Sequence, residues 1–91
     1  MNKLQVLNVI APAFHAGHTF VVKFDTDKEG VAVPENLRGR VLEVSAHRDT
    51  GACVIGECLC MTVNDTVLVV PFSAVLSVRV QRLRLIKGGK S

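Results

Sequence analysis

The sequence predicts a mostly β fold, either a small barrel or a two-layer antiparallel sheet, with a short N-terminal helix. The 91 residues are enough for one domain. Hydrophobic residues make up 48% of the chain, yet there is no Trp or Tyr and there are only four Phe, so the apolar mass is mostly Val, Leu, Ile and Ala. β-Branched side chains favour strands. Short apolar runs, separated by turn residues, predict five or six strands.

The first segment, residues 4–14, fits two patterns. Apolar residues recur along it at helical spacing: Leu4, Leu7, Ala11 and Phe14. The alternation of a strand also fits Leu4, Val6 and Ile10. Pro12 disfavours a helical backbone at the residue before it. Between the two, we favour a short helix.

Clear alternation begins after Gly17. In residues 19–24, one face carries Phe20, Val22 and Phe24, and the other carries Thr19, Val21 and Lys23. This pattern predicts a strand. Residues 25–30 form a predicted polar turn, and residues 31–33 a short extended piece that Pro34 closes.

Residues 40–63 predict further strands around one loop. In residues 40–45 the alternation puts Leu42 and Val44 on one face, opposite Val41, Glu43 and Ser45. Residues 47–51 form a predicted loop. The long extended run of residues 53–63 is predicted to be two strands hinged at Gly56.

The strongest turn signal is Asn64-Asp65, which lies between two apolar runs. Both residue types tolerate positive φ, as a two-residue type I′ hairpin turn requires. Residues 71–74 then predict one helical turn, and residues 75–85 a last strand that alternates Val78 and Val80 with Arg79 and Gln81.

The charge is uneven along the chain. The net charge is +3, but no acidic residue follows Asp65. Five basic residues lie in the C-terminal part: Arg79, Arg82, Arg84, Lys87 and Lys90. Without these five, the 11 basic residues fall to six, against eight acidic ones. We therefore predict a single β domain over residues 1–82 and a basic C-terminal tail over residues 83–91.

The cysteines and histidines suggest a metal site, but their spacing argues against one. His15 and His18 could join Cys58 and Cys60, yet structural zinc prefers two cysteines with two to four residues between them, Cys58 and Cys60 have only one, and there is no second pair. We predict no metal and no cofactor, with the cysteines packing as small apolar residues. The odd number of thiols is unusual for a secreted disulfide scaffold and favours a cytoplasmic protein.

Enzymatic activity is not expected either. Cys53, His47 and Asp49 lie close in the sequence, but nothing marks a strained turn or an oxyanion loop around a nucleophile. A phosphate-binding glycine loop in a strand–loop–helix setting is also missing. No apolar run approaches the roughly 18 residues of a membrane span. These patterns favour a cytoplasmic binding protein without a membrane segment.

The order of several short motifs resembles the stringent starvation protein B (SspB) family, whose Sm-like domain delivers tagged peptides to the ClpXP protease. The motifs are FVVKF, GVAVP (30–34), RVLEVSA (40–46), Thr50-Gly51 and, after the hairpin, VPFSAVLSV (70–78). The C-terminal Leu83-Arg84-Leu85-Ile86-Lys87 is similar to the Leu-Arg-Val-Val-Lys-like motif with which the family docks on ClpX. Here the N-terminal helix is shorter than in the family, and no linker precedes the tail motif.

The resemblance implies a non-catalytic adaptor that binds an extended degradation tag of the ssrA type. It places the peptide groove between the strand at 40–45 with its following loop and the hairpin. One side is then lined by Val44, Ala46 and His47, and the other by Met61 and Val63. ClpX docking falls to the tail residues Leu83, Arg84, Leu85, Ile86 and Lys87.

Two further expectations concern partners. A homodimer through the N-terminal apolar segment (Leu4, Leu7, Phe14) would bury the excess apolar surface of so short a chain. The alternative function is that of a small β-barrel that binds single-stranded RNA. The basic tail fits this alternative, but the scarcity of aromatic residues for base stacking does not.

Overall fold

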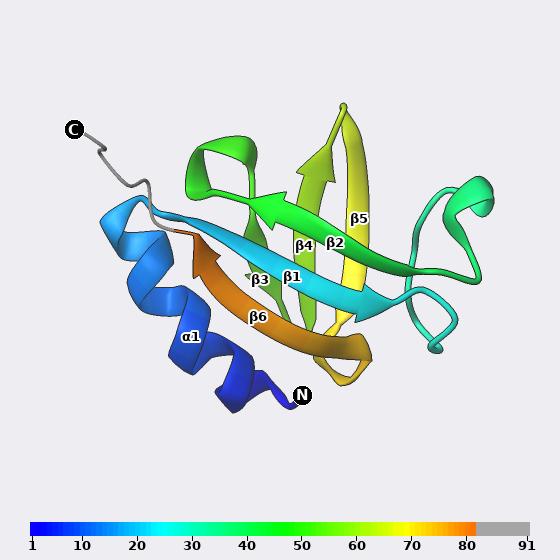
Figure 1. The fold of residues 1–91 in the computed structure, drawn as a ribbon, viewed down its shortest axis with the longest axis horizontal. Helices are drawn as coiled ribbons and strands as arrows, with labels where there is room; N and C mark the ends of the chain where they lie inside the picture. The colour runs from blue at the N-terminus through cyan, green and yellow to red at the C-terminus, as the bar shows by residue number, and fades with distance from the viewer. Residues whose placement is uncertain (82–91) are drawn as a thin grey trace, which may run out of the picture.

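The computed structural model describes residues 1–81, which form one N-terminal helix and two three-stranded antiparallel sheets (Figure 1). In chain order the elements are α1 (Lys3–Ala16), β1 (Thr19–Asp25), η1 (Glu35–Leu37), β2 (Val41–Ala46), η2 (Arg48–Thr50), β3 (Cys53–Ile55), β4 (Cys58–Val63), β5 (Thr66–Pro71), η3 (Phe72–Ala74) and β6 (Val75–Gln81), where η is a 3₁₀ turn. The predicted mostly β fold with an N-terminal helix is confirmed. The predicted tail, residues 83–91, lies outside the described residues.

α1 confirms the helical interpretation of the first segment. A capping box begins it: the Asn2 side chain accepts a hydrogen bond from the Gln5 N–H at 2.8 Å, and the Gln5 side chain accepts one from the Asn2 N–H at 2.9 Å. Gly17 ends it with φ +74°, a left-handed conformation that suits glycine. Pro12 lies inside the helix but on its exposed side, where water can replace the hydrogen bond that proline cannot donate.

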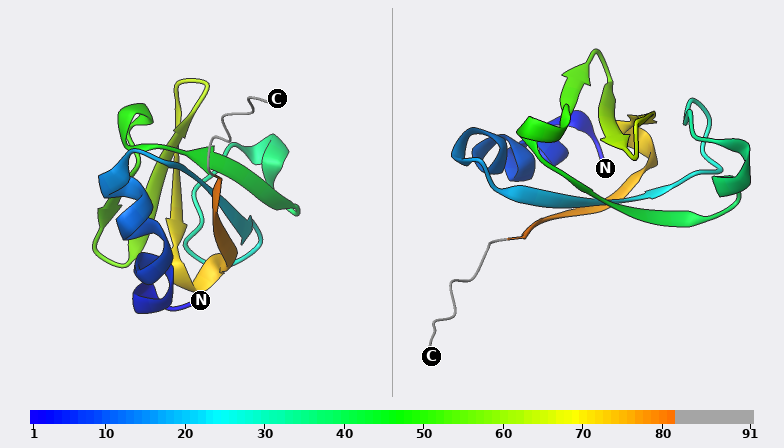
Figure 2. Two further views of the ribbon diagram at one scale, coloured as in Figure 1. Left: turned by 60° about the vertical axis from the view of Figure 1, so that its left-hand side comes forward. Right: turned by 90° about the horizontal axis from the view of Figure 1, so that it is seen from above.

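The two sheets have the strand orders β2–β1–β6 and β3–β4–β5, and they lie as two layers whose strands cross steeply (Figures 1 and 2). β1 is the central strand of the first sheet, and it pairs Phe20 with Ala46 of β2 and with Val80 of β6. β4 is central in the second sheet. A single bridge, Ala32 to Val69, joins the loop after β1 to β5.

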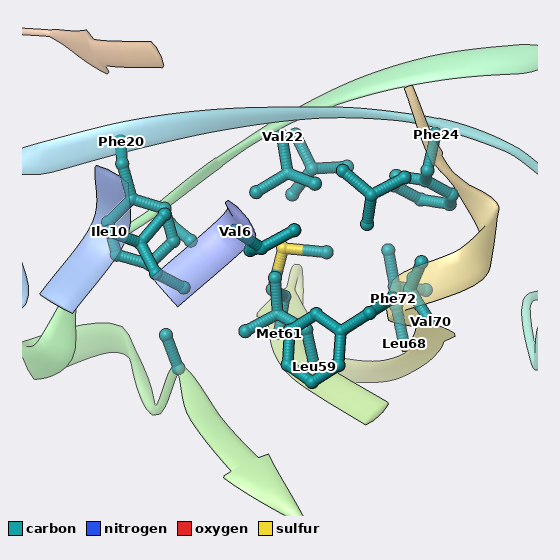
Figure 3. Packing of buried hydrophobic residues seen from close by; sticks show 14 of the residues in the cluster. Val6, Ile10, Phe20, Val22, Phe24, Leu59, Met61, Leu68, Val70 and Phe72 are labelled. Carbon is teal, nitrogen blue, oxygen red and sulfur yellow. The ribbon is translucent and has the colours of Figure 1, made fainter. Parts of the chain in front are cut away.

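The core fills the space between the two sheets and α1. The predicted inner face of β1 (Phe20, Val22, Phe24) is fully buried and meets side chains from β4 and β5. Figure 3 shows these groups pointing toward one another: Val6 and Ile10 from α1, Phe20, Val22 and Phe24 from β1, and Leu59, Met61, Leu68 and Val70 from the β4–β5 hairpin. Each sheet therefore supplies one wall of the core, and α1 closes one end.

The predicted turns are also confirmed. Asn64 and Asp65 both have positive φ, +50° and +66°, as expected for a type I′ hairpin turn between β4 and β5. The run of residues 53–63 divides at Gly56, φ +60°, into β3 and β4. Residues 72–74 form the predicted helical turn, as η3. The last strand was predicted to reach residue 85, and its described part, β6, ends at Gln81.

A buried threonine holds the long loop between β1 and β2. Thr26 is fully buried, and its hydroxyl lies 2.7 Å from the Arg40 carbonyl and 3.2 Å from the Leu37 carbonyl. The same hydroxyl accepts a hydrogen bond from the Arg40 N–H at 2.9 Å. The Arg38 guanidinium donates to the Val31 carbonyl at 2.9 Å. These bonds fix the segment that carries η1.

Replacing Thr26 with valine is expected to lower the free energy of unfolding by about 1–3 kcal/mol, because the partly buried hydrogen bond from the Arg40 N–H loses its acceptor. Thr26→Ser is the matched control: it keeps the hydroxyl and loses one methyl group, a cost near 0.8 kcal/mol. Urea unfolding of the two variants measures the difference. Equal stability of Thr26→Val and the unmodified protein would contradict this role of the hydroxyl.

Candidate binding cleft

A cleft of about 300 Å³ lies between β2, the β4–β5 hairpin and the loop that carries η1. The loop contributes Pro34, Asn36 and Leu37. β2 contributes Leu42, Glu43 and Val44, and the hairpin contributes Val63, Asn64, Thr66 and Leu68. The cleft therefore combines aliphatic side chains with a few uncharged polar groups and one carboxylate, which is a common composition for a binding site.

The cleft runs along the free edge of β2. β2 is an outer strand of its sheet, and β1 is its one strand partner within residues 1–81. Three consecutive β2 residues line the cleft, although successive side chains of a strand point to opposite faces. A cavity that touches three residues in a row reaches past the side chains of one face, to the backbone or the edge of the strand. The backbone of β2 therefore borders the cleft.

The opposite wall is the open end of the hairpin. Val63 and Thr66 form the last residue pair before the Asn64-Asp65 turn, and Val63 is half-buried while Thr66 is exposed. The next inward pair, Met61 and Leu68, is 0% and 2% exposed. Along the hairpin, Met61 is therefore part of the core, whereas the next pair toward the turn, Val63 and Thr66, lines the cleft.

The structure places the five predicted peptide-binding residues in three different settings. Val44 and Val63 both line the cleft. Ala46 and Met61 belong to the core instead, with 3% and 0% exposure, so they offer no surface to a bound peptide. The physical reason is the layered arrangement: the inner faces of β2 and β4 cover each other, and only their ends near the hairpin turn diverge. His47 forms the third setting.

His47 is engaged by the protein's own backbone. Its Nδ1 accepts a hydrogen bond from the Asp49 N–H at 3.0 Å, so the ring proton sits on Nε2, which donates to the Gly17 carbonyl at 2.8 Å. The neighbouring Arg48 donates to the His15 carbonyl at 2.9 Å. The loop after β2 is therefore hydrogen-bonded to the C-terminal end of α1 and the residue that follows it. His47 takes part in this contact and does not line the cleft.

Sequence reasoning missed Leu37, Leu42 and Thr66. Thr66 could have been found, because a two-residue turn at Asn64-Asp65 fixes its pairing with Val63. Leu37 had no such signal, since its position depends on the distant hydroxyl of Thr26.

A second cavity, of about 290 Å³, lies between α1 and β3 and is almost entirely apolar. Its walls include Leu7, Ile10 and Phe14 from α1 and Val54 and Leu59 from the second sheet. Two of the residues predicted to form a dimer interface, Leu7 and Phe14, are half-buried here, whereas Leu4 is 70% exposed.

The histidines and cysteines considered as metal ligands lie apart in the fold. His15 is in the last turn of α1, His18 lies between α1 and β1, and Cys58 and Cys60 are on β4. Within residues 1–81, no group of three or more His, Cys, Asp or Glu side chains is arranged to hold a metal ion. Among the described residues no helix is long and apolar enough to cross a membrane; their one α-helix, α1, has 14 residues.

No protein-family model, curated protein or solved structure matches this chain.

Proposed function

We propose that this protein is a non-catalytic peptide-binding module whose cleft takes an extended segment of another protein. The observation that carries the proposal is the free edge of β2 beside an aliphatic cleft. An extended peptide can pair with the backbone of such an edge while every second side chain enters a pocket. Leu42 and Val63, which are half-buried, supply apolar contacts for those side chains, and Asn36, Asn64 and Thr66 supply hydrogen-bonding groups.

The particular role we propose is that of a cytoplasmic adaptor with an SspB-like, Sm-like domain, which binds an ssrA-type degradation tag and delivers the tagged protein to ClpXP. The tail motif at residues 83–87 would dock on the ClpX unfoldase. Holding the substrate near the unfoldase raises its effective concentration, so two weak contacts give efficient delivery. A homodimer through α1 would double the number of docking tails.

The alternative, a small β-barrel that binds single-stranded RNA, has less support. Base stacking needs exposed aromatic rings. Of the four Phe, Phe20, Phe24 and Phe72 are buried, and Phe14 is half-buried against the core. The basic residues that favour RNA are mostly those after residue 81.

Thr66→Arg is expected to weaken binding of a labelled tmRNA-encoded tag peptide at least tenfold, which is about 1.4 kcal/mol. Thr66 is exposed and lines the cleft, so the long side chain can fill the cleft without disturbing the core. Fluorescence anisotropy titration measures the affinity, and single-stranded RNA titrated in parallel tests the alternative.

Val67→Arg is the matched control. Val67 is the next residue of β5, is 60% exposed and points to the other face of the sheet, so this variant should bind the peptide normally. Equal affinity of the two folded variants would rule out the cleft as the peptide site.

A further inference from the structure

The three cysteines gather on one face of the β3–β4 pair. Cys53 of β3 lies directly opposite Cys60 of β4 in the strand register. Cys58 precedes Cys60 by two residues, so its side chain points to the same face, where it lies opposite Ile55. This face is turned away from the core, because Leu59 and Met61, which alternate with these cysteines, point inward.

The geometry selects one pair for a disulfide. Directly opposite residues of an antiparallel pair have Cα atoms roughly 4.5–5.5 Å apart. A disulfide spans Cα separations of about 4.4–6.8 Å, so Cys53 and Cys60 can be joined without moving the backbone. The diagonal pair, Cys53 and Cys58, is about 7–8 Å apart. Cys58 and Cys60, two residues apart on one strand, are separated by about 6.7 Å, at the limit of the range.

The two thiols have different surroundings. Cys53 lies exposed on an outer strand, where a small oxidant in solution can reach it. Cys60 is 7% exposed, and burial raises the pKa of its thiol, with the neighbouring Cys53 and Cys58 raising it further. The pair therefore combines an accessible thiol with a protected thiol on the directly opposite residue of the neighbouring strand.

We propose that Cys53 and Cys60 form a site of reversible oxidation to a cross-strand disulfide, with hydroperoxides as the oxidant. The Cys53 thiolate attacks the peroxide, the O–O bond breaks, and Cys53 becomes a sulfenic acid with release of water or an alcohol. The Cys60 sulfur then attacks the Cys53 sulfur. The S–S bond forms, the S–O bond breaks, and hydroxide leaves with the thiol proton as water. The two thiols together lose two electrons, and the peroxide gains them.

The disulfide would cross-link β3, the shortest strand of the second sheet, to β4. β3 has three residues, all exposed, and β4 is its one strand partner within the described residues. Ala52, Cys53 and Val54 also line the apolar cavity beside α1. The cross-link would hold this wall of the cavity against β4. The proposal stands independently of the peptide-binding function.

The test is oxidation of the reduced full-length chain with hydrogen peroxide, followed by digestion at glutamate. Cleavage after Glu57 separates Cys53, in fragment 44–57, from Cys58 and Cys60, in fragment 58–91. The expected product has one free thiol left, and its two fragments stay linked until reductant is added. Fragmentation in the mass spectrometer should assign the linked sulfurs to Cys53 and Cys60.

Variants give an independent readout. Cys58→Ala should form the linked pair as fast as the unmodified protein, whereas Cys60→Ala should do so at least about tenfold more slowly. Cys53→Ala, at an exposed position that tolerates the change, should abolish the link. A link that maps to Cys58, undiminished cross-linking of Cys60→Ala, or three thiols that remain free or oxidise separately would each overturn the proposal.

Discussion

Replacing Met61 with aspartate is expected to unfold the protein at room temperature. Met61 is 0% exposed and lies at the centre of the core, between Leu59 and the side chains of α1 and β1 (Figure 3). The substitution removes the packing of a large apolar group, worth about 2–5 kcal/mol, and adds a buried carboxylate that has no partner. Domains have a total stability of only about 5–15 kcal/mol, and one this small belongs near the lower end.

Far-UV circular dichroism and urea unfolding measure this outcome. Met61→Leu is the matched control, because it conserves volume and polarity and should cost less than about 1.5 kcal/mol. The SspB resemblance leads to a different outcome, with Met61 lining the peptide groove. A folded Met61→Asp variant that has lost only its affinity for the tag peptide would support that placement and contradict the core position.

Deleting residues 83–91 is expected to abolish stimulation of ClpXP degradation while thermal stability and tag-peptide affinity stay nearly unchanged. The strand pairing supports the expected lack of change in thermal stability. Gln81 already pairs with Thr19, the first residue of β1, so the pairing between β6 and β1 is complete without the deleted residues. The described residues that line the cleft, which include Leu42 near the start of β2, likewise all precede the deletion.

The same truncation distinguishes the other interpretations. If the protein binds RNA, the loss of Arg84, Lys87 and Lys90 should lower RNA affinity and flatten its dependence on salt. If Leu83 and Leu85 instead continue the inward face of the last strand, the deletion should reduce stability by roughly 2–5 kcal/mol for each large buried side chain lost. A melting temperature that collapses on deletion would exclude a docking role that is separate from the fold.

Local signals in the sequence were enough for most elements. The Asn64-Asp65 turn, the hinge at Gly56 and the alternation of β1 depend on backbone conformations and side-chain periods within a few neighbouring residues. The helix at the N-terminus was harder, because Pro12 conflicted with the apolar spacing. The helix forms with Pro12 on its exposed side, where the missing hydrogen bond costs little, but it buries Val6, Ile10 and Ala13 rather than the residues whose spacing predicted it.

What covers each face was decided by the tertiary structure alone. Alternation correctly grouped Val21 with Lys23 on the outward face of β1, yet Val21 is only 5% exposed. On this face Arg79 of β6 pairs with Glu43 of β2 at 3.1 Å, from strands on either side of β1. The period of a strand specifies which side chains share a face, and it carries no information about which distant residues lie over that face.

The candidate site shows the same division. Val44 and Val63 were predicted to line opposite sides of one groove, and both line the cleft, since each lies on a face that local alternation identifies. Met61, two residues before Val63 on the same face, is core rather than cleft, and His47 contacts the segment after α1 and does not line the cleft. The two sheets diverge between Met61 and Val63, so Met61 is buried and Val63 lines the cleft. The point of divergence depends on the crossing of the sheets and on the loop held by Thr26, and both are set by contacts between residues far apart in the chain.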